Sequence, residues 1–263
     1  MTFKDGNYRT PANEMYERNH NLIPEIDAED YELELMGSLG DEEPLATLTL
    51  EDLKKMPEHS VETIIACAGN RRKALQAIFP RVKGLPWTNG AIANALYKGV
   101  PMRHILLEVM KLREEDLIGK GLHLVMVSYD SDFQGKPYEV SIPLEDALNP
   151  SNEIIVAYEM NGEDIPKVHG YPVRVICPGY IGVRCPKWLN RLVISTEEAD
   201  SAPQRNDYKI VSEKDITKVD WSAYKCVYTN ILNSAFVYPG YDEEIAASDD
   251  KTVEIQGWAH GNG

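Results

Sequence analysis

Residues 61 to 72 read Val-Glu-Thr-Ile-Ile-Ala-Cys-Ala-Gly-Asn-Arg-Arg, an apolar run that ends in a cysteine and two arginines. The apolar part, Val61 to Ile65, predicts a buried strand. Cys67 therefore lies where that strand ends, close in sequence to Arg71 and Arg72. Neighbouring cations lower the pKa of a thiol and favour the thiolate, which binds metals or attacks electrophiles. The simpler interpretation is a small buried cysteine before a Gly-Asn turn. Motifs elsewhere in the chain are needed to distinguish a metal-binding thiol from a structural one.

Composition limits the classes of protein that the chain can represent. Its 263 residues are 43% hydrophobic and 26% charged, which suits one large domain or one domain plus part of another. The net charge of -15 argues against nucleic acid and against an anionic membrane as partners, since both require a basic face. The arginines nevertheless cluster locally, around Arg71 to Lys73 and Arg184 to Arg191.

The N-terminus and the cysteines predict neither an export signal nor a disulfide framework. Met1 to His20 is polar and lacks the apolar centre of a signal peptide, and no run has the length of a transmembrane helix. The compartment, cytoplasmic or organellar, stays open. Four cysteines are too few for a disulfide scaffold in a chain of this size. The sequence contains no Cys-x-x-Cys spacing, so it does not predict a structural zinc site.

Strand-like and helix-like stretches interleave without a regular period. Thr49 and Asp52 resemble a capping box that starts a helix over 50–56. Pro101 opens a second helix, whose apolar positions at helical spacing predict core residues. Further strands are expected over residues 31–35, 122–127, 154–160, 171–176 and 189–194, with a polar loop over 128–132. This mixture predicts an α+β fold rather than a doubly wound sheet.

The character of the chain changes after about residue 235. Residues 242–250 form an acidic, linker-like run, and Thr252 to Ala259 alternates as a strand before a glycine turn. A lone strand is not stable by itself, so we interpret it as half of a hairpin in a truncated, all-β second domain. The predicted division is therefore 1–235 and 236–263.

Four short motifs occur in order along the chain: Arg18-Asn19-His20, Ala66 to Arg72, His169 to Arg174 and Arg184 to Leu189. In order and approximate spacing they resemble the molybdenum domain shared by sulfite oxidases and eukaryotic nitrate reductases. Residues 83–87 and 157–162 match that family as well, so the resemblance covers nearly the whole chain. Each motif alone is weak, whereas their joint occurrence in one order is specific.

The resemblance implies molybdenum bound to a molybdopterin in a fold of mixed sheets and short helices. An immunoglobulin-like dimerisation domain would follow, of which 253–263 resembles the first strand and turn. Cys67 matches the metal-ligating cysteine, and a soft thiolate suits molybdenum beside the sulfurs of the pterin. The pterin phosphate calls for buried cations and forked donors. By resemblance, the residues that hold the cofactor are Tyr16, Glu17, Arg18, Asn19, His20, Asp130, His169, Arg174, Cys185, Pro186 and Lys187.

The implied substrate is a small oxyanion, sulfite, oxidised to sulfate by oxygen-atom transfer. Arg18, Arg72, Trp87 and Tyr208 match the sulfite pocket of the family, to which the dimerisation domain adds a further arginine. Electrons would leave to oxygen or to a haem protein, and a complete C-terminal domain would make the protein a homodimer. Two alternatives stay open: the molybdenum domain of an assimilatory nitrate reductase, and an inactive truncated relative.

The candidate residues also have plain structural interpretations. Arg174 could pair with Glu159, and His169 could be a loop histidine whose hydrogen bonds are satisfied. Lys187 could be solvated surface, and Tyr208 an ordinary half-exposed aromatic. The family pattern favours function at these positions, as an analogy.

Overall fold

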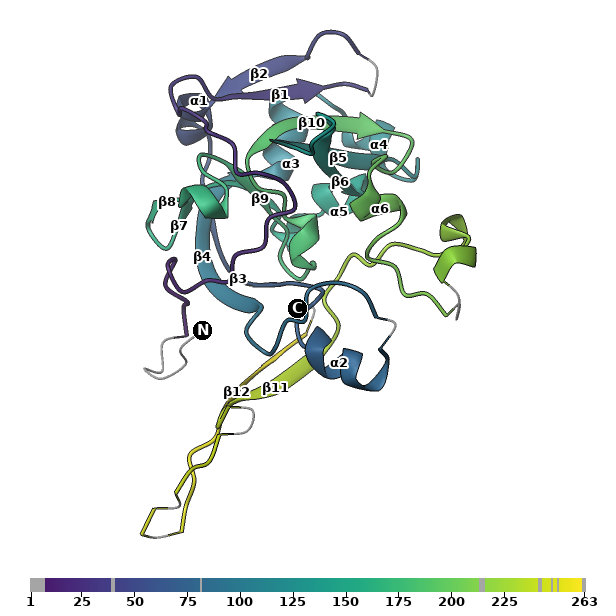
Figure 1. Cartoon of the computed structure of the whole chain (residues 1–263). Coiled ribbons are helices and arrows are strands. Elements are labelled where there is room, and N and C mark those ends of the chain that lie inside the picture. The colour runs from purple at the N-terminus through teal and green to yellow at the C-terminus, as the bar shows by residue number, and fades with distance from the viewer. Residues whose placement is uncertain are drawn as a thin grey trace.

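The chain folds into mixed sheets with few short helices, which agrees with the predicted α+β class. The structure is a computed structural model that describes residues 8–38, 41–80, 82–212, 216–240, 243–246, 248–249 and 251–261. Two five-stranded sheets build the body, and a two-stranded hairpin projects away from it (Figure 1).

The first sheet has the strand order β2-β1-β10-β5-β6. Strands β1 and β10 run parallel, and the other neighbours are antiparallel. The alternation around Tyr31 places Tyr31, Leu33 and Leu35 in the core, each fully buried. The strand bounds are β1 Glu32–Met36, β2 Ala46–Thr49, β5 His123–Ser131, β6 Pro137–Pro143 and β10 Leu189–Ser195.

The second sheet is antiparallel and has the order β3-β4-β7-β8, with β9 also paired to β7. Strand β3 contains the apolar run that ends beside Cys67. Its partner β4 is long enough to pair with both β3 and β7. The bounds are β3 His59–Ala66, β4 Ile92–Pro101, β7 Ile155–Met160, β8 Glu163–Asp164 and β9 Arg174–Ile176.

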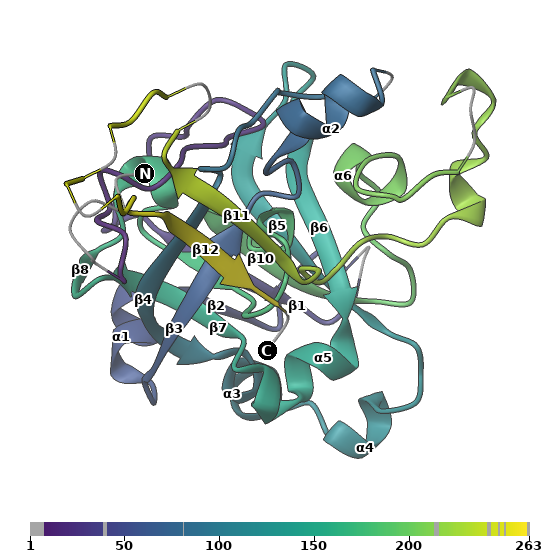
Figure 2. The same cartoon turned by 90° about the horizontal axis from the view of Figure 1, so that it is seen from below.

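The helices are short, and both predicted helix starts are confirmed. Thr49 caps α1: its hydroxyl accepts from the Asp52 amide at 3.1 Å, and the Asp52 carboxylate accepts from the Thr49 amide. Figure 2 shows α3, α4 and α5 on the side of the body opposite α2. The bounds are α1 Leu50–Lys55, α2 Arg72–Ile78, α3 Met102–His104, α4 Glu114–Leu117, α5 Leu144–Leu148 and α6 Ala202–Arg205, with a π-helical turn over Ile105–Val109.

A large apolar core fills the space that these elements enclose. Of the predicted core positions of the second helix, Met102, Ile105, Leu106 and Met110 are buried in it, and Val109 is partly buried against it. Burying one such side chain is worth roughly 1.5–3 kcal/mol, so this core supplies the rigidity on which the polar site depends.

The predicted polar loop over 128–132 is wrong for most of its length. Strand β5 continues through Ser131, and its pairing with β6 is interrupted between Val127 and Ser131. The interruption lies around Asp130, whose carboxylate is buried. The expected strand over 171–176 begins only at Arg174. Sequence patterns also missed β2, β4, β6 and α2.

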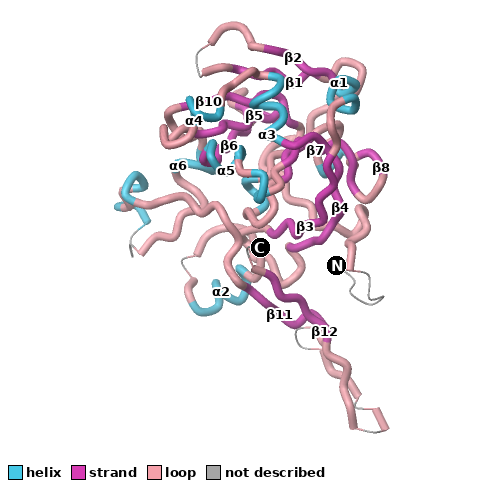
Figure 3. The backbone as a smooth tube through the Cα atoms, turned by 180° about the vertical axis from the view of Figure 1, so that it is seen from behind, coloured by secondary structure: helices cyan, strands magenta, loops and turns pink. Residues whose placement is uncertain are grey.

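The C-terminal strand differs from its prediction in length and in pairing. It is β12, Gln256–His260, and it pairs antiparallel with β11, Asn233–Tyr238. The half-hairpin interpretation was therefore wrong, because the partner precedes it in the sequence. The hairpin leaves the body near α2 (Figures 1 and 3). The division between 235 and 236 falls inside β11, and the two-domain organisation stays a prediction.

Candidate cofactor and active site

The site lies where strand ends from both sheets meet. The segment 185–189 connects them: the Val175 amide donates to the Pro186 carbonyl at 2.9 Å, and the Tyr129 amide donates to the Trp188 carbonyl at 2.8 Å. Strand β3 joins through a bridge between Ala66 and Ile181. Segments far apart in the sequence thus enclose one pocket, which extends from the Cys67 turn to Lys187.

Arg174 and Arg184 are the largest fully buried side chains in the described residues, and Arg174, with 2% of its surface exposed, lines the pocket. Arg174 donates to the carbonyl of His169 at 2.7 Å and to that of Cys185 at 3.0 Å, while its Nε has no partner. Among the described residues no carboxylate forms an ion pair with it. A buried guanidinium with only neutral partners is costly, so this end of the pocket suits an anion.

Gly170 allows this cationic cluster to be compact. Its φ is +117°, and a Cβ there would lie 3.0 Å from the Lys187 Cβ and 3.1 Å from the Arg174 Cβ. The turn also fixes His169, which is buried and hydrogen-bonded through Nε2 to the carbonyl of Ala12 at 2.9 Å. The motif His169 to Arg174 therefore folds around its glycine.

Lys187 lies beside these groups and is half-buried. Its ammonium donates to the Asn19 side chain and to the Val168 carbonyl, the latter at 2.9 Å. Burial, together with repulsion from Arg174 and against the attraction of Asp130, lowers the pKa of Lys187 to about 7. Burial raises the pKa of Asp130 to about 6, against the hydrogen bond from Asn21. The pocket thus destabilises its own charges when no ligand compensates them.

Cys67 lies at the other end of the pocket, half-buried in a tight turn. The Gly69 amide donates to its sulfur at 3.3 Å, and the Asn70 amide donates to its carbonyl at 2.8 Å. Both arginines of this turn are held by other segments, and the Arg72 guanidinium also lies against Gly69 in the turn itself. Arg71 donates to Asn233 and Ser234 of the hairpin at 2.8 and 2.7 Å, and Arg72 donates to the Leu85 carbonyl at 2.9 Å.

A polar group with aromatic members faces the same part of the pocket. His20 Nε2 and the Tyr208 hydroxyl are hydrogen-bonded at 3.0 Å, and the His20 ring lies 5.5 Å from the Tyr138 ring. Burial, together with the nearby Cys67 and against the attraction of Arg18, raises the pKa of Tyr208 to about 12. Tyr208 therefore keeps its proton at neutral pH and can donate a hydrogen bond to an anion.

The structure brings most of the predicted site residues together. Those that line the pocket are Tyr16, Arg18, Asn19, His20, Cys67, Asp130, His169, Arg174, Cys185, Pro186, Lys187 and Tyr208. Glu17, Arg72 and Trp87 do not line it, although the Trp87 ring packs edge-on against Tyr16 with centroids 6.1 Å apart.

Sequence reasoning missed several residues of the lining, among them Met15, Tyr138, Val183 and Trp188. Tyr138 is the most informative, because its hydroxyl donates to the Val183 carbonyl at 3.0 Å while its ring contacts His20. It lies on β6, which carried no recognised strand pattern. Position on the strand, not any motif, brings it to the site.

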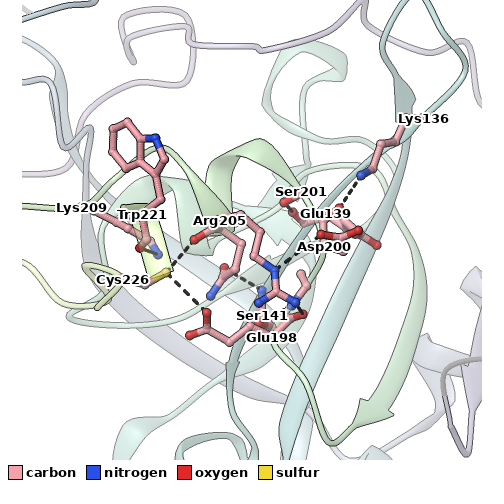
Figure 4. Close-up of polar contacts among 12 residues, drawn as sticks. Lys136, Glu139, Ser141, Glu198, Asp200, Ser201, Arg205, Lys209, Trp221 and Cys226 are labelled. Carbon is pink, nitrogen blue, oxygen red and sulfur yellow. Dashed lines mark hydrogen bonds and ion pairs between the residues drawn. The ribbon is translucent and has the colours of Figure 1, made fainter. Parts of the chain in front are cut away.

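The structure contradicts the structural interpretation of Arg174 and agrees in part with that of His169. Arg174 does not pair with Glu159, whose partner is Lys98 at 2.6 Å. His169 does have a satisfied ring nitrogen, and it still lines the pocket. Cys226 lies outside the pocket, in a polar cluster with Glu198 and Lys209 (Figure 4). Its thiol donates to the Gln204 carbonyl at 2.8 Å.

Comparison with known proteins assigns the fold. Residues 20–203 match the family model described as oxidoreductase molybdopterin binding domain. The chain belongs to this family. It is 39% identical over 258 residues to a mitochondrial sulfite oxidase of Drosophila melanogaster, covering 97% of this chain and 43% of that one. A nitrate reductase of Brassica napus is 32% identical over 276 residues, covering 97% of this chain and 28% of the relative.

A solved structure agrees with this membership. The sulfane dehydrogenase SoxCD of Paracoccus pantotrophus has a TM-score of 0.69 and 25% identity, covering 89% of this chain and 54% of that one. The chain spans about half the length or less of the animal sulfite oxidases that it matches, 43% of the Drosophila melanogaster protein and 46% of the human one.

The residues present fit the molybdenum–molybdopterin cofactor that this family binds. The unpartnered Nε of Arg174 and the destabilised ammonium of Lys187 suit a phosphate, and Asp130 suits the amino groups of a pterin. Cys67 offers a soft ligand at the opposite end. Within the described ranges, no cluster of three or more His, Cys, Asp or Glu side chains offers an all-protein metal site, and no helix could cross a membrane.

Proposed function

We propose that this chain oxidises sulfite to sulfate by oxygen-atom transfer at a molybdenum centre ligated by Cys67. The observation that carries the proposal is the meeting of Cys67, Arg18 and Tyr208 in one pocket. A cation and a protonated phenol beside the metal-binding thiol suit a small oxyanion. Sulfite oxidases of animals and of Arabidopsis thaliana, 32% to 39% identical, support the same substrate.

Each residue has a separate part in this proposal. The cofactor supplies the oxygen-atom transfer and accepts two electrons when bound. Arg18 and Arg72 attract and neutralise the anion, and Tyr208 donates to one of its oxygens. Trp87 packs against Tyr16 and shapes the approach to Cys67. Arg174, Lys187 and the other cofactor-binding residues predicted above hold the pterin and its phosphate.

The partners follow from the same family. We propose that electrons pass to oxygen or to a haem protein. We also propose that 236–263 begins an immunoglobulin-like dimerisation domain, which would contribute an arginine to the substrate pocket and make the protein a homodimer. Analytical ultracentrifugation of chains with and without such an extension measures this directly.

A paired assay separates sulfite from nitrate as the substrate. Sulfite oxidation with ferricyanide and nitrate reduction with reduced viologen are measured on the same molybdenum-loaded preparation. We expect sulfite turnover to dominate. Tyr208→Phe removes one donor to a charged group, worth about 1.5–3 kcal/mol, so kcat/KM for sulfite falls roughly ten- to hundredfold.

The control is Tyr224→Phe, which removes a hydroxyl that contacts Ser212 outside the pocket and leaves both assays unchanged. Faster nitrate reduction that is insensitive to Tyr208→Phe would favour a nitrate reductase domain. A loaded protein with neither activity would favour the inactive relative.

A further inference from the structure

Two cysteines whose thiols have no part in the proposed oxygen-atom transfer lie against each other at the cofactor pocket. The Cys177 amide donates to the Cys185 sulfur at 3.3 Å, and the Cys185 thiol is directed back to the Cys177 carbonyl at 3.7 Å. The Cys177 thiol is directed to the carbonyl of Arg184, the residue before Cys185, at 3.4 Å. Each thiol is thus folded onto the other segment, and both are free in the structure.

The backbone at this place has the spacing that a disulfide requires. Cys177 follows β9 directly, and the segment containing Cys185 is hydrogen-bonded to β9 through Val175 and Pro186 at 2.9 Å. Hydrogen-bonded neighbouring segments lie about 5 Å apart, within the 4.4–6.8 Å Cα separation that disulfides typically span. We therefore expect rotation of the two short side chains to bring the sulfurs within bonding distance.

Access to the two thiols is unequal. Both residues are buried, Cys185 with 2% and Cys177 with 0% of its surface exposed, and of the two Cys185 lines the pocket. The Cys177 side chain and Arg174 also lower the pKa of the Cys185 thiol, whereas burial raises the pKa of the Cys177 thiol. Both the route of access and the ease of ionisation therefore favour Cys185 as the first sulfur to react.

We propose that Cys177 and Cys185 form a peroxide-reactive dithiol that closes to a disulfide in the cofactor-free pocket and is shielded when molybdopterin is bound. The Cys185 thiolate attacks one oxygen of hydrogen peroxide, which gives a sulfenic acid and, after protonation, one water. The Cys177 sulfur then displaces the sulfenic oxygen as a second water, and the S–S bond forms. Two thiol hydrogens and one peroxide are consumed.

The consequence concerns cofactor loading. The Cys185 carbonyl accepts a hydrogen bond from Arg174, so the disulfide lies within the cluster that would hold the pterin phosphate. Oxidation of the two thiols in the cofactor-free protein should alter this cluster and slow insertion of the cofactor. In the loaded protein the cofactor would cover Cys185 and protect it. The inference rests on the cofactor of the family and not on the choice between sulfite and nitrate.

The test counts thiols in cofactor-free and cofactor-loaded full-length protein, with circular dichroism confirming that both are folded. Both are treated with hydrogen peroxide, denatured and titrated for free thiols, and peptides are mapped by mass spectrometry. We expect the cofactor-free protein to lose two of its four thiols, with one cross-linked peptide pair containing Cys177 and Cys185. Dithiothreitol should restore all four, and the loaded protein should react at least about tenfold more slowly, because the pocket is covered.

Single variants separate the steps. Cys185→Ser should form no cross-link, and Cys177→Ser should stop at a sulfenic acid that dimedone traps on Cys185. Cys226→Ser, outside the pocket, is the matched control and should behave as wild type. A cross-link between Cys67 and Cys185, a scrambled pattern that includes Cys226, no cross-link, or equal rates in free and loaded protein would each overturn the proposal.

Discussion

Two pairs of cationic side chains, one in the lining of the pocket and one in the turn beside Cys67, differ in the groups that hydrogen-bond to them. Arg174 and Lys187 lie in the interior with carbonyl and amide partners only. Arg71 and Arg72 are half-buried at the surface and are held by backbone oxygens of the hairpin and of the loop at Leu85. Among the described residues no carboxylate forms an ion pair with the first pair, whereas the second pair has its hydrogen bonds supplied by the fold.

In the sequence both pairs belong to clusters of basic residues. In the structure one pair is placed to bind an anionic ligand, and the other fixes the shape of a loop. A buried cation without a counter-charge costs folding energy unless a ligand supplies the charge. A guanidinium bound to carbonyls fixes the shape of a loop and still contributes a positive field. We therefore propose that the interior pair holds the cofactor phosphate, that the surface pair shapes the turn around Cys67, and that Arg72 also attracts the proposed substrate.

The largest expected effect follows from removing the interior guanidinium. Arg174→Met should reduce bound molybdenum and molybdopterin to less than about a tenth of wild type, because charged hydrogen bonds of about 1.5–3 kcal/mol each are lost. Metal analysis and pterin fluorescence per folded chain measure this. Arg191→Met, which removes a surface ion pair to Glu34, is the control and should load normally. Normal molybdenum and pterin content in Arg174→Met would contradict the proposal that the buried cations bind the cofactor.

A smaller effect is expected at the surface pair. Arg72→Gln should raise the KM for sulfite about ten- to hundredfold while molybdenum content stays near wild type, since one cation is lost from the substrate approach. The KM is measured by steady-state kinetics on wild-type and variant preparations matched for molybdenum content. Loss of molybdenum with an unchanged KM would assign Arg72 to the cofactor instead.

The smallest effect concerns pH and Lys187 in the cofactor-free protein. The ordinary pKa of lysine is 10.5, and burial, with repulsion from Arg174, lowers that of Lys187 to about 7. Between these values the unfolded chain binds more protons than the folded chain, so the free energy of unfolding rises with pH from about 7 to 10.5. Thermal unfolding from pH 7 to 9 should show this rise in wild type and less of it in Lys187→Met.

Lys120→Met, an exposed lysine far from the pocket lining, should keep the full wild-type rise. Binding of the cofactor should flatten the rise, because the phosphate holds the proton on Lys187. An identical pH profile in wild type and Lys187→Met would mean that Lys187 is not destabilised in the empty pocket.

Sequence patterns predicted the strands and helices that carry their own signals. The capping box at Thr49, the apolar run before Cys67 and the helical spacing after Pro101 are local, and all three are present in the structure. Strands β4 and β6 were missed, since β4 is buried along most of its length and lacks alternation. The pairing of β11 with β12 depends on residues far apart and left no local trace.

The site was predicted through the family pattern, and geometry refined it. The motifs around His20, Cys67, Arg174 and Lys187 meet in one pocket as expected. The partners of Arg71 could not be foreseen, because they lie on a hairpin more than 150 residues away in sequence. Tyr138 was equally hidden, since a single tyrosine on an unrecognised strand carries no signal.

The central claim is that Cys67 ligates molybdenum in a pocket that binds the pterin independently through its buried cations. The most direct test compares Cys67→Ser with Cys226→Ser for bound pterin and for sulfite oxidation in the same preparations. The account predicts that Cys67→Ser keeps the wild-type circular dichroism and most of its pterin, because Arg174 and Lys187 are intact, and loses sulfite oxidation below a tenth of wild type. Cys226→Ser should match wild type in both. Sulfite oxidation by Cys67→Ser above that level would contradict the account.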